Sequence, residues 1–480
     1  MKEIALIAVP LLAAVAALAW PKDASRPRLL PLAAALHSAL ALWMLVVPPA
    51  VAEGAWFGFD AVARAVLPAV SLLFLACSVY GVAYLRIRAE RGNRVFVAAL
   101  LVLLGLISLS IQARHLGLLW IAAEGATLAT VPLLHYTNTA RAFEATWKYL
   151  LVGGTGIALS LLGSFFLGYA SLHGGGGGDL TFTALAAPDA HLSRPWVLAA
   201  WVFLLTGYGT KMGLAPMHTW KPDAYGEAPG IVGAVLAGGM TTVAFVALLR
   251  VRQVVDAAGF GGMASMTLLT LGLFSMVVAA LFLLGTPDFK RMLAYSSVEH
   301  MGILSVGAAL GGAGLFAALF HVWNNSLTKG ALFLSAGNLH RAAGGRTLDQ
   351  VAGMTWLTPM SARIFVTGLF AVTACPPFGP FFSELGIVRA ALDAGRGWAV
   401  AVFLTCLLLA FLGMTRLVFA IVDSRPRRVS RQVAARCRET LGVLLPPLLL
   451  LAASLALGLV APAFLREAWM AAVHNLLPTP

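Results

Sequence analysis

The amino-acid sequence predicts an all-α, polytopic membrane protein with about fourteen transmembrane helices. Of its 480 residues, 60% are hydrophobic and 11% are charged, and the mean hydropathy is +0.87. A water-soluble core cannot bury that much apolar surface. The apolar residues form runs of about 20, the length needed to cross roughly 30 Å of hydrocarbon. Short loops that are rich in Lys and Arg separate these runs, so lipid is the predicted solvent.

Fourteen spans can be delimited by this rule. They cover residues 3–20, 29–48, 65–85, 95–112, 115–135, 148–170, 195–215, 230–250, 264–285, 291–311, 313–338, 362–383, 397–422 and 440–462. The first run also resembles a cleavable signal peptide, but Glu3 and its full length favour a retained helix.

The net charge of +13 is interpreted as a marker of topology, because the basic residues gather in the loops that follow odd-numbered spans. The chain is therefore expected in the cytoplasmic (inner) membrane with both termini on the outer face, and not on nucleic acid. The most basic loop follows span thirteen and either anchors on anionic lipid or docks a partner subunit. It contains Arg425, Arg427, Arg428, Arg431, Arg436 and Arg438.

No cofactor or metal site of its own is predicted for the chain. The four cysteines Cys77, Cys375, Cys406 and Cys437 are far apart and form no C-x-x-C pair. Walker A and G-x-G-x-x-G motifs are also missing from the sequence. The loops 221–227 and 341–346 are too short for an extramembrane catalytic domain, so any redox chemistry is expected in partner subunits.

The informative residues are ionisable side chains within the apolar runs. Such groups are costly in lipid, so they face the interior and mark an ion pathway or a structural pair. Five positions stand out, and two of them carry a neighbouring histidine. They are Glu124, Lys211, Glu299 with His300, Lys329 with His321 eight residues earlier, and Glu384.

Two of these positions lie next to prolines. Pro216 follows Lys211 and Pro380 precedes Glu384, and each proline interrupts helical hydrogen bonding. Interrupted spans at corresponding places of two halves are typical of transporters built from inverted repeats. Spans seven and twelve are five apart, which predicts two inverted five-helix repeats with broken helices 7 and 12. The alternative is ordinary kinks with structural charges.

This repeat hypothesis divides the chain into four parts. They are an N-terminal group of helices 1–3 (1–94), a first repeat of helices 4–8 (95–250), a second repeat of helices 9–13 (251–423), and a basic loop with helix 14 (424–480).

Three motifs carry a family resemblance. Residues 211–229, K-M-G-L-A-P-M-H-T-W-K-P-D-A-Y-G-E-A-P, resemble the K-x-x-x-x-P-x-H-x-W-L-P-D-A-H-x-E-A-P signature of the antiporter-like subunits of respiratory complex I and Mrp antiporters. Residues 288–302 resemble the D-x-K-R-x-L-A-Y-S-S segment of the same family, and residues 321–333 resemble its H-x-x-x-H-x-x-x-K-x-x-L-F helix. Residues 298–302 and 376–384 look most like hydrogenase-4 component F of group 4 nickel–iron hydrogenases.

The resemblance implies a role for each residue. Glu124 and Lys211 would form the acid and base pair of a first half-channel, Lys329 the central relay, and Glu384 the site leading to the far half-channel. Through water, His218, His300 and His321 would bridge them, with His300 or His321 on the Lys211 side of Lys329.

Two positions depart from the family pattern. Thr242 stands where many relatives have a further span-eight lysine, and Asn325 replaces the second histidine of the span-eleven motif. A relay must therefore depend on water or on Glu299 and His300.

The predicted function is a proton or Na⁺ translocating subunit of a multisubunit oxidoreductase of the hydrogenase-4 or formate hydrogenlyase type. Its expected partners are other membrane-arm subunits and a cytoplasmic module resembling a nickel–iron hydrogenase. Two alternatives stay open: a complex I or Mrp-type cation/proton antiporter subunit, and a membrane subunit of an inorganic carbon uptake complex.

Overall fold

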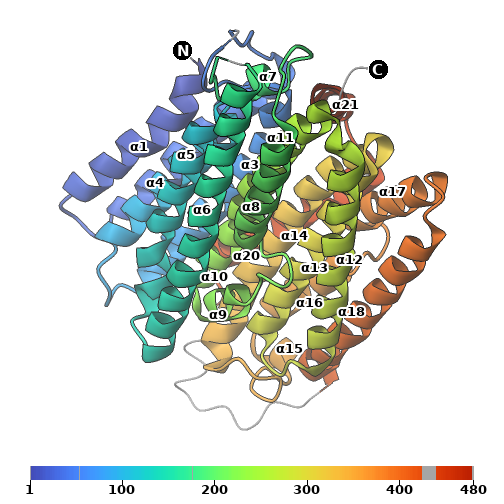
Figure 1. Cartoon of the computed structure of the whole chain (residues 1–480). Helices are drawn as coiled ribbons and strands as arrows, with labels where there is room; N and C mark the ends of the chain where they lie inside the picture. Colours follow the sequence, from blue (N-terminus) through green and yellow to red (C-terminus); the bar gives the residue numbers. More distant parts are fainter. Residues whose placement is uncertain (1, 53, 176, 424–438, 478–480) are drawn as a thin grey trace.

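The computed structural model describes residues 2–52, 54–175, 177–423 and 439–477 as a bundle of helices (Figure 1). No β-strand occurs in these ranges, which contain three isolated β-bridges between loops. The N-terminal helices are α1 (Lys2–Ala19), α2 (Leu29–Val46) and α3 (Ala61–Ile87). The chain begins and ends at the same end of the bundle, drawn uppermost in Figure 1.

The next helices correspond to the predicted first repeat. They are α4 (Arg94–Gln112), α5 (Leu116–Leu134), α6 (Ala140–His173), α8 (Arg194–Met212), the short α9 (Trp220–Glu227), α10 (Gly230–Val235) and α11 (Thr241–Val255). A π-helix, η3 (Leu236–Met240), joins α10 to α11 within one continuous span. A loop helix, α7 (Phe182–Leu185), precedes α8.

The remaining helices fall in the predicted second repeat and in the C-terminal part of the chain. They are α12 (Gly261–Gly285), α13 (Phe289–Leu310), α14 (Gly312–Ala343), α15 (Met354–Leu357), α16 (Pro359–Val372), α17 (Gly379–Asp393), α18 (Gly397–Asp423), α20 (Leu441–Leu459) and α21 (Ala463–Leu476). Each of the fourteen predicted spans coincides with one helix or with one broken pair. In the described residues, nine helical segments are long and apolar enough to cross a membrane. The helices α8, α13 and α14 are outside this apolar set because they carry polar and charged side chains.

Equivalent helices of the two halves pack in equivalent pairs. Helix α4 contacts α5 as α12 contacts α13, and α6 contacts α8 as α14 contacts both α16 and α17. The pairing of α8 with α11 is matched by that of α17 with α18. In this correspondence α5 is equivalent to α13. Each half therefore carries a glutamate on its second helix, Glu124 on α5 and Glu299 on α13.

Helix α14 lies at the centre of the bundle (Figure 1) and packs against α3, α10, α13, α16, α17 and α20. Its middle section is buried throughout, including His321 and Lys329. Large apolar side chains such as Phe165 on α6 and Phe419 on α18 are exposed on the outside instead. The molecule is therefore apolar where it meets lipid and polar along its axis, as intramembrane ion pathways require.

Local sequence signals fix where the helices begin and end. Asp60 accepts a hydrogen bond from the backbone N–H of Ala63 and starts α3, and Thr139 does the same for Ala142 at the start of α6. Helix α8 ends at Gly213, whose φ of +79° is the left-handed conformation that glycine adopts without strain.

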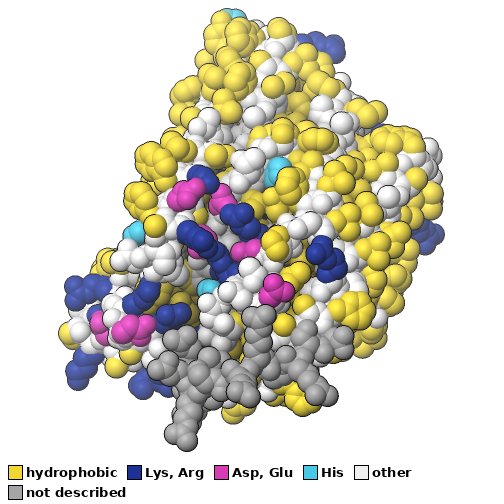
Figure 2. Space-filling view, turned by 90° about the horizontal axis from the view of Figure 1, so that it is seen from below, with side chains coloured by type: hydrophobic (Ala, Val, Ile, Leu, Met, Phe, Trp, Pro, Cys, Tyr) yellow, Lys and Arg dark blue, Asp and Glu magenta, His cyan; other side chains and the backbone are white. Residues whose placement is uncertain are grey.

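The end of the bundle opposite the termini, called the lower face below, carries clustered charges (Figure 2). This face corresponds to the predicted cytoplasmic side. The arginine-rich segment from Arg425 to Arg438, expected to anchor or dock here, lies outside the described residues, as does Cys437.

Candidate functional site

Both predicted helix breaks are present. Helix α8 ends at Met212 and α9 begins at Trp220, with Pro216 in the gap. Helix α16 ends at Val372 and α17 begins at Gly379, so Pro380 is the second residue after the second gap. The continuous helices that would have contradicted the prediction do not occur, and the broken helices 7 and 12 are confirmed.

Lys211 is in the last turn of α8, immediately before the first break. Its side chain is 4% exposed, and its Nζ has no hydrogen-bond partner among the residues that the structure describes. Glu124 on α5 is the carboxylate whose charge acts on it, and Lys211 in turn acts on Glu124. One oxygen of Glu124 is buried without a hydrogen-bond partner, and among the described residues no direct ion pair joins Glu124 to Lys211. Two groups that do not touch can exchange a proton through a water molecule that bridges them.

Close packing of α6 on α8 fixes the position of Lys211. A Cβ on Gly207 would lie 2.5 Å from the carbonyl oxygen of Gly156, and a Cβ on Gly156 would lie 2.8 Å from Cβ of Thr210. Small residues allow this approach of two backbones, a common device in membrane helix pairs. Lys211 follows Gly207 by four residues and therefore lies one turn farther along α8.

His218 lies in the first break, next to a cavity that reaches in from the lower face. The cavity has a volume of about 550 Å³, and its lining includes Arg141, Arg291, Phe282 and Tyr295. The His218 ring contacts Tyr295 and Phe282, with centroid distances of 6.2 and 6.5 Å. His218 thus contacts two of the residues that line this cavity.

Lys329 forms a central cluster with two carboxylates. Its side chain is completely buried, and its Nζ donates a hydrogen bond to Ser296 Oγ. Glu299 on α13 and Glu384 on α17, which are 3% and 2% exposed, are the carboxylates whose charges act on it. Both oxygens of Glu384 are buried, and within the described ranges neither has a hydrogen-bond partner. One lysine therefore faces two glutamates that belong to different helices.

His300 and His321 form a row of hydrogen bonds at the second break. His300 Nδ1 lies 2.8 Å from His321 Nε2, and His321 Nδ1 lies 2.9 Å from Ser383 Oγ. Each neutral imidazole carries one N–H, so the protons of this row can all point toward Ser383 or all toward His300. Switching between these two arrangements moves one proton along the pair. Ligand atoms of both histidines lie within 4.8 Å of a Glu384 oxygen, and the expected place of one of them on the Lys211 side of Lys329 stays a prediction.

The three groups His300, His321 and Glu384 are also close enough to converge on one ion. The two facing imidazole nitrogens, however, are separated by a hydrogen-bond distance and their rings are nearly coplanar, with an interplanar angle of 18°. One of these nitrogens donates its N–H to the lone pair of the other, so neither is directed at a shared ion. This geometry is that of a proton-sharing pair.

The two departures from the family pattern lie against the π-helix η3. Thr242 Oγ1 donates to the carbonyl oxygen of Gly238 at 2.7 Å, and Asn325 Nδ2 donates to that of Ala237 at 3.1 Å. Both side chains thus bond to backbone carbonyls of a π-bulge, a feature that often marks functional sites. Neither side chain titrates near neutral pH.

Lys221 is a buried residue of the site region that was not predicted from the sequence. We placed residues 221–227 in a loop, whereas they belong to the helix α9, and Lys221 is completely buried there. Its Nζ donates to the carbonyl oxygen of Met212 at 2.6 Å. The sequence did contain a sign that Lys221 is unusual, because lysine stands where the family signature has leucine.

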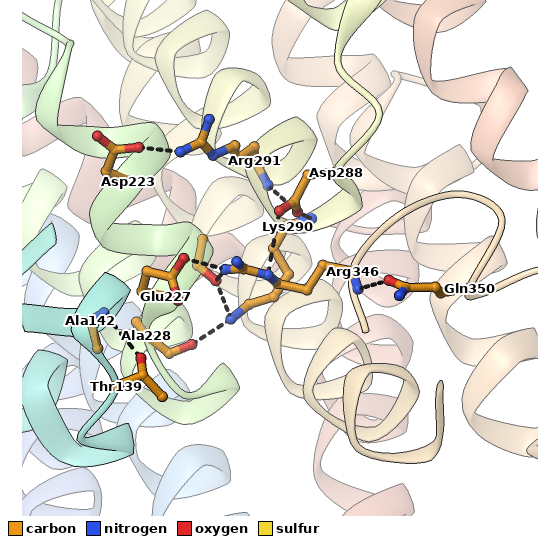
Figure 3. Close-up of polar contacts among 11 residues, drawn as sticks. Thr139, Ala142, Asp223, Glu227, Ala228, Asp288, Lys290, Arg291, Arg346 and Gln350 are labelled. Carbon is orange, nitrogen blue, oxygen red and sulfur yellow. Dashed lines mark hydrogen bonds and ion pairs between the residues drawn. The ribbon is translucent and has the colours of Figure 1, made fainter. Parts of the chain in front are cut away.

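The charged residues around α9 on the lower face were also missed (Figure 3). Asp223 bonds to both Lys148 on α6 and Arg291 on α13. Glu227 pairs with Arg346 at 2.7 Å. Helix α9 is therefore attached by ion pairs to both halves of the molecule.

Two relatives with known names are similar to this chain in sequence. A hydrogenase-4 component F homolog of Methylacidiphilum infernorum is 38% identical over 288 residues, which are 59% of this chain and 60% of that protein. The match thus spans less than two thirds of that relative. NADH-quinone oxidoreductase subunit N of Desulforudis audaxviator is 32% identical over 75% of this chain and 71% of its own length.

A solved structure shares the fold. The fold covers 99% of this chain and 98% of a chain in the membrane-bound sulfane sulfur reductase, an archaeal respiratory membrane complex, with a TM-score of 0.86 at 22% identity. The family model described as NADH:quinone oxidoreductase/Mrp antiporter, TM, matches residues 113–410. This range contains all eight predicted path residues and both breaks. The chain belongs to the NADH:quinone oxidoreductase/Mrp antiporter transmembrane family, as an antiporter-like subunit of the hydrogenase-4, complex I and Mrp type.

Proposed function

We propose that this chain translocates protons across the cytoplasmic membrane as a subunit of a hydrogenase-4-type complex, driven by redox chemistry in partner subunits. The observation that carries the proposal is a set of titratable groups inside the bundle: Lys211 and Glu384 are buried beside the two helix breaks, Lys329 is buried in α14, and Glu124 is half-buried on α5. Burying so many ionisable groups in a membrane bundle is costly, and ion movement is the usual reason for it.

The chemistry of these groups favours H⁺ over Na⁺ as the ion. Lys211 and Lys329 are cations in their protonated form and repel a metal cation at close range. His300 and His321 are arranged to pass a proton through direct hydrogen bonds. The basic loops on the lower face favour an orientation in which this face is cytoplasmic and both termini are on the outer side. Protons would then be taken up through the cavity beside His218.

The family itself includes Mrp antiporters, so the alternative of cation/proton exchange is tested together with the proposal. A tagged copy of the chain is purified from native membranes, and its partners are identified by mass spectrometry. The expected partners are membrane-arm subunits and a nickel–iron hydrogenase-like module. Recovery of antiporter subunits alone would support the alternative.

The intact complex is then reconstituted into vesicles, and dithionite-reduced methyl viologen is added as electron donor. We expect a pH change in the vesicle lumen that is the same with and without Na⁺ and is abolished by a protonophore. Electron transfer without any pH change would contradict the proposal.

A further inference from the structure

The buried lysine of α9 has no place in the path described above. Lys221 is 0% exposed, lies in the first turn of α9 directly after the first break, and donates to Met212 O, the last carbonyl of α8. Its Nζ is 5.8 Å from the centre of the Tyr225 ring. A Cβ on Gly213 would lie 2.5 Å from its side chain, so the glycine at the end of α8 leaves room for it.

The neighbours of this amine are bases and not acids. No carboxylate pairs with Lys221 among the ion pairs of the described residues. Its charge instead acts on His218 and His300, and it is coupled to Lys329. A permanent ammonium without a counter-ion is one of the most expensive groups to bury. A lysine that releases its proton avoids this cost for part of the time.

The location of Lys221 matches a gap in the path. His218 lies at the cavity from the lower face, and Lys329 lies in the central cluster. Thr242 and Asn325, which stand where the family pattern has a lysine and a histidine, have no titratable proton and use their polar groups on backbone carbonyls. Lys221 is electrostatically coupled to a group on each side of this gap.

We propose that Lys221 is a proton-carrying residue that connects His218 with the Lys329 cluster, in the role that a lysine at position 242 would otherwise have. The inference rests on the proposed proton translocation. Nζ takes a proton from the His218 side as a neutral amine and gives one up toward Lys329 as an ammonium, so no redox partner is needed. The hydrogen bond to Met212 persists in both forms, because a neutral amine still carries two N–H groups.

Two substitutions separate this role from a structural one. Lys221→Arg keeps the cation and its donor for Met212 O, but a guanidinium does not release its proton at physiological pH. Lys221→Met removes both the charge and the donor. General acid and base groups contribute roughly 10²–10⁴-fold, so we expect both variants to lose at least about tenfold in methyl viologen-driven pumping.

Assembly of the variant complexes is checked by co-purification, and their electron transfer is measured in detergent. If Lys221→Arg pumps like the wild type while Lys221→Met does not, Lys221 is a structural cation and the proposal is wrong. Wild-type pumping by Lys221→Met also overturns it.

A second-site experiment tests whether a lysine at position 242 can take over the role of Lys221. Thr242→Lys in the Lys221→Met background is expected to restore pumping, whereas Thr242→Met in the same background is the matched control and should not. Failure of the assembled Thr242→Lys double variant to pump would contradict the equivalence of the two positions.

Failure of this inference can be told apart from failure of the proposed function. Lys329→Met is measured in parallel as the reference. If Lys329→Met abolishes pumping but Lys221 variants pump normally, only the inference about Lys221 is wrong. If Lys329→Met also pumps normally, the proposed function itself is contradicted.

Discussion

Replacing Gly207 by alanine is predicted to displace Lys211 and to uncouple the first site. The new Cβ would lie 2.5 Å from the carbonyl oxygen of Gly156 and 2.7 Å from Ser160, whereas ordinary contact begins at 3.4 Å. Helix α8 must therefore move away from α6 by about 0.9 Å at the point of contact, the difference between 3.4 and 2.5 Å. Overpacking of this kind costs roughly 1–3 kcal/mol.

Gly154→Ala is the matched control on α6. A Cβ at Gly154 meets nothing within 4 Å, and alanine has a better helix propensity than glycine. We expect Gly207→Ala to lower the apparent melting temperature of the solubilised complex and to reduce methyl viologen-driven pumping, with electron transfer retained. Gly154→Ala should match the wild type in both measurements.

Pumping is the decisive readout, because Lys211 is one turn from the contact and its distance from Glu124 changes with the helix. A Gly207→Ala variant with wild-type stability and wild-type pumping would refute the reasoning. It would show that the α6–α8 contact does not set the position of Lys211.

Three further predictions concern other parts of the path and its support. Lys329→Met should abolish pumping with assembly intact, because the amine that is electrostatically coupled to both buried glutamates is lost, whereas the exposed His474→Ala should leave pumping unchanged. Ser383→Ala removes one end of the histidine row and should slow pumping while electron transfer in detergent stays normal. Asp60→Asn removes the charge that holds the 2%-exposed Arg250 at 2.7 Å and should destabilise the subunit by about 3–5 kcal/mol, measured as a lower melting temperature.

Each of these predictions has a contrary outcome. Pumping by the Lys329 variant would leave this subunit as a scaffold. Equal pumping rates for wild type and Ser383→Ala would remove the serine from the row. An Asp60→Asn complex that melts at the wild-type temperature would show that solvent, and not Asp60, compensates the charge of Arg250.

The sequence predicted the helices well because apolar length alone determines a membrane span. Helix α6 begins at Ala140 and not near 148, since its first turns carry charged residues that project past the apolar zone. Helix α21 was not predicted because its 14 residues are too few to cross the bilayer. The breaks were predicted because proline marks them directly.

Other features of the site left no readable mark. The π-helix at 236–240 differs from its flanking helices only in hydrogen-bond register, which residue types do not specify. The place of His300 and His321 beside Glu384 depends on how α13, α14 and α17 pack, and spacing along one helix cannot reveal it. Lys221 was placed in a loop because its neighbours Pro222 and Asp223 are typical of loops.

The short helix α9 also has a mechanical consequence. Its eight residues form a stiff rod of about 12 Å, with the buried amine of Lys221 near one end and the ion-paired carboxylate of Glu227 at the other. Asp223 clamps the rod to α6 and to α13 at the lower face. Lys221 and Asp223 belong to this one rigid helix, so any displacement of the ion pairs at the lower face would also displace the buried amine.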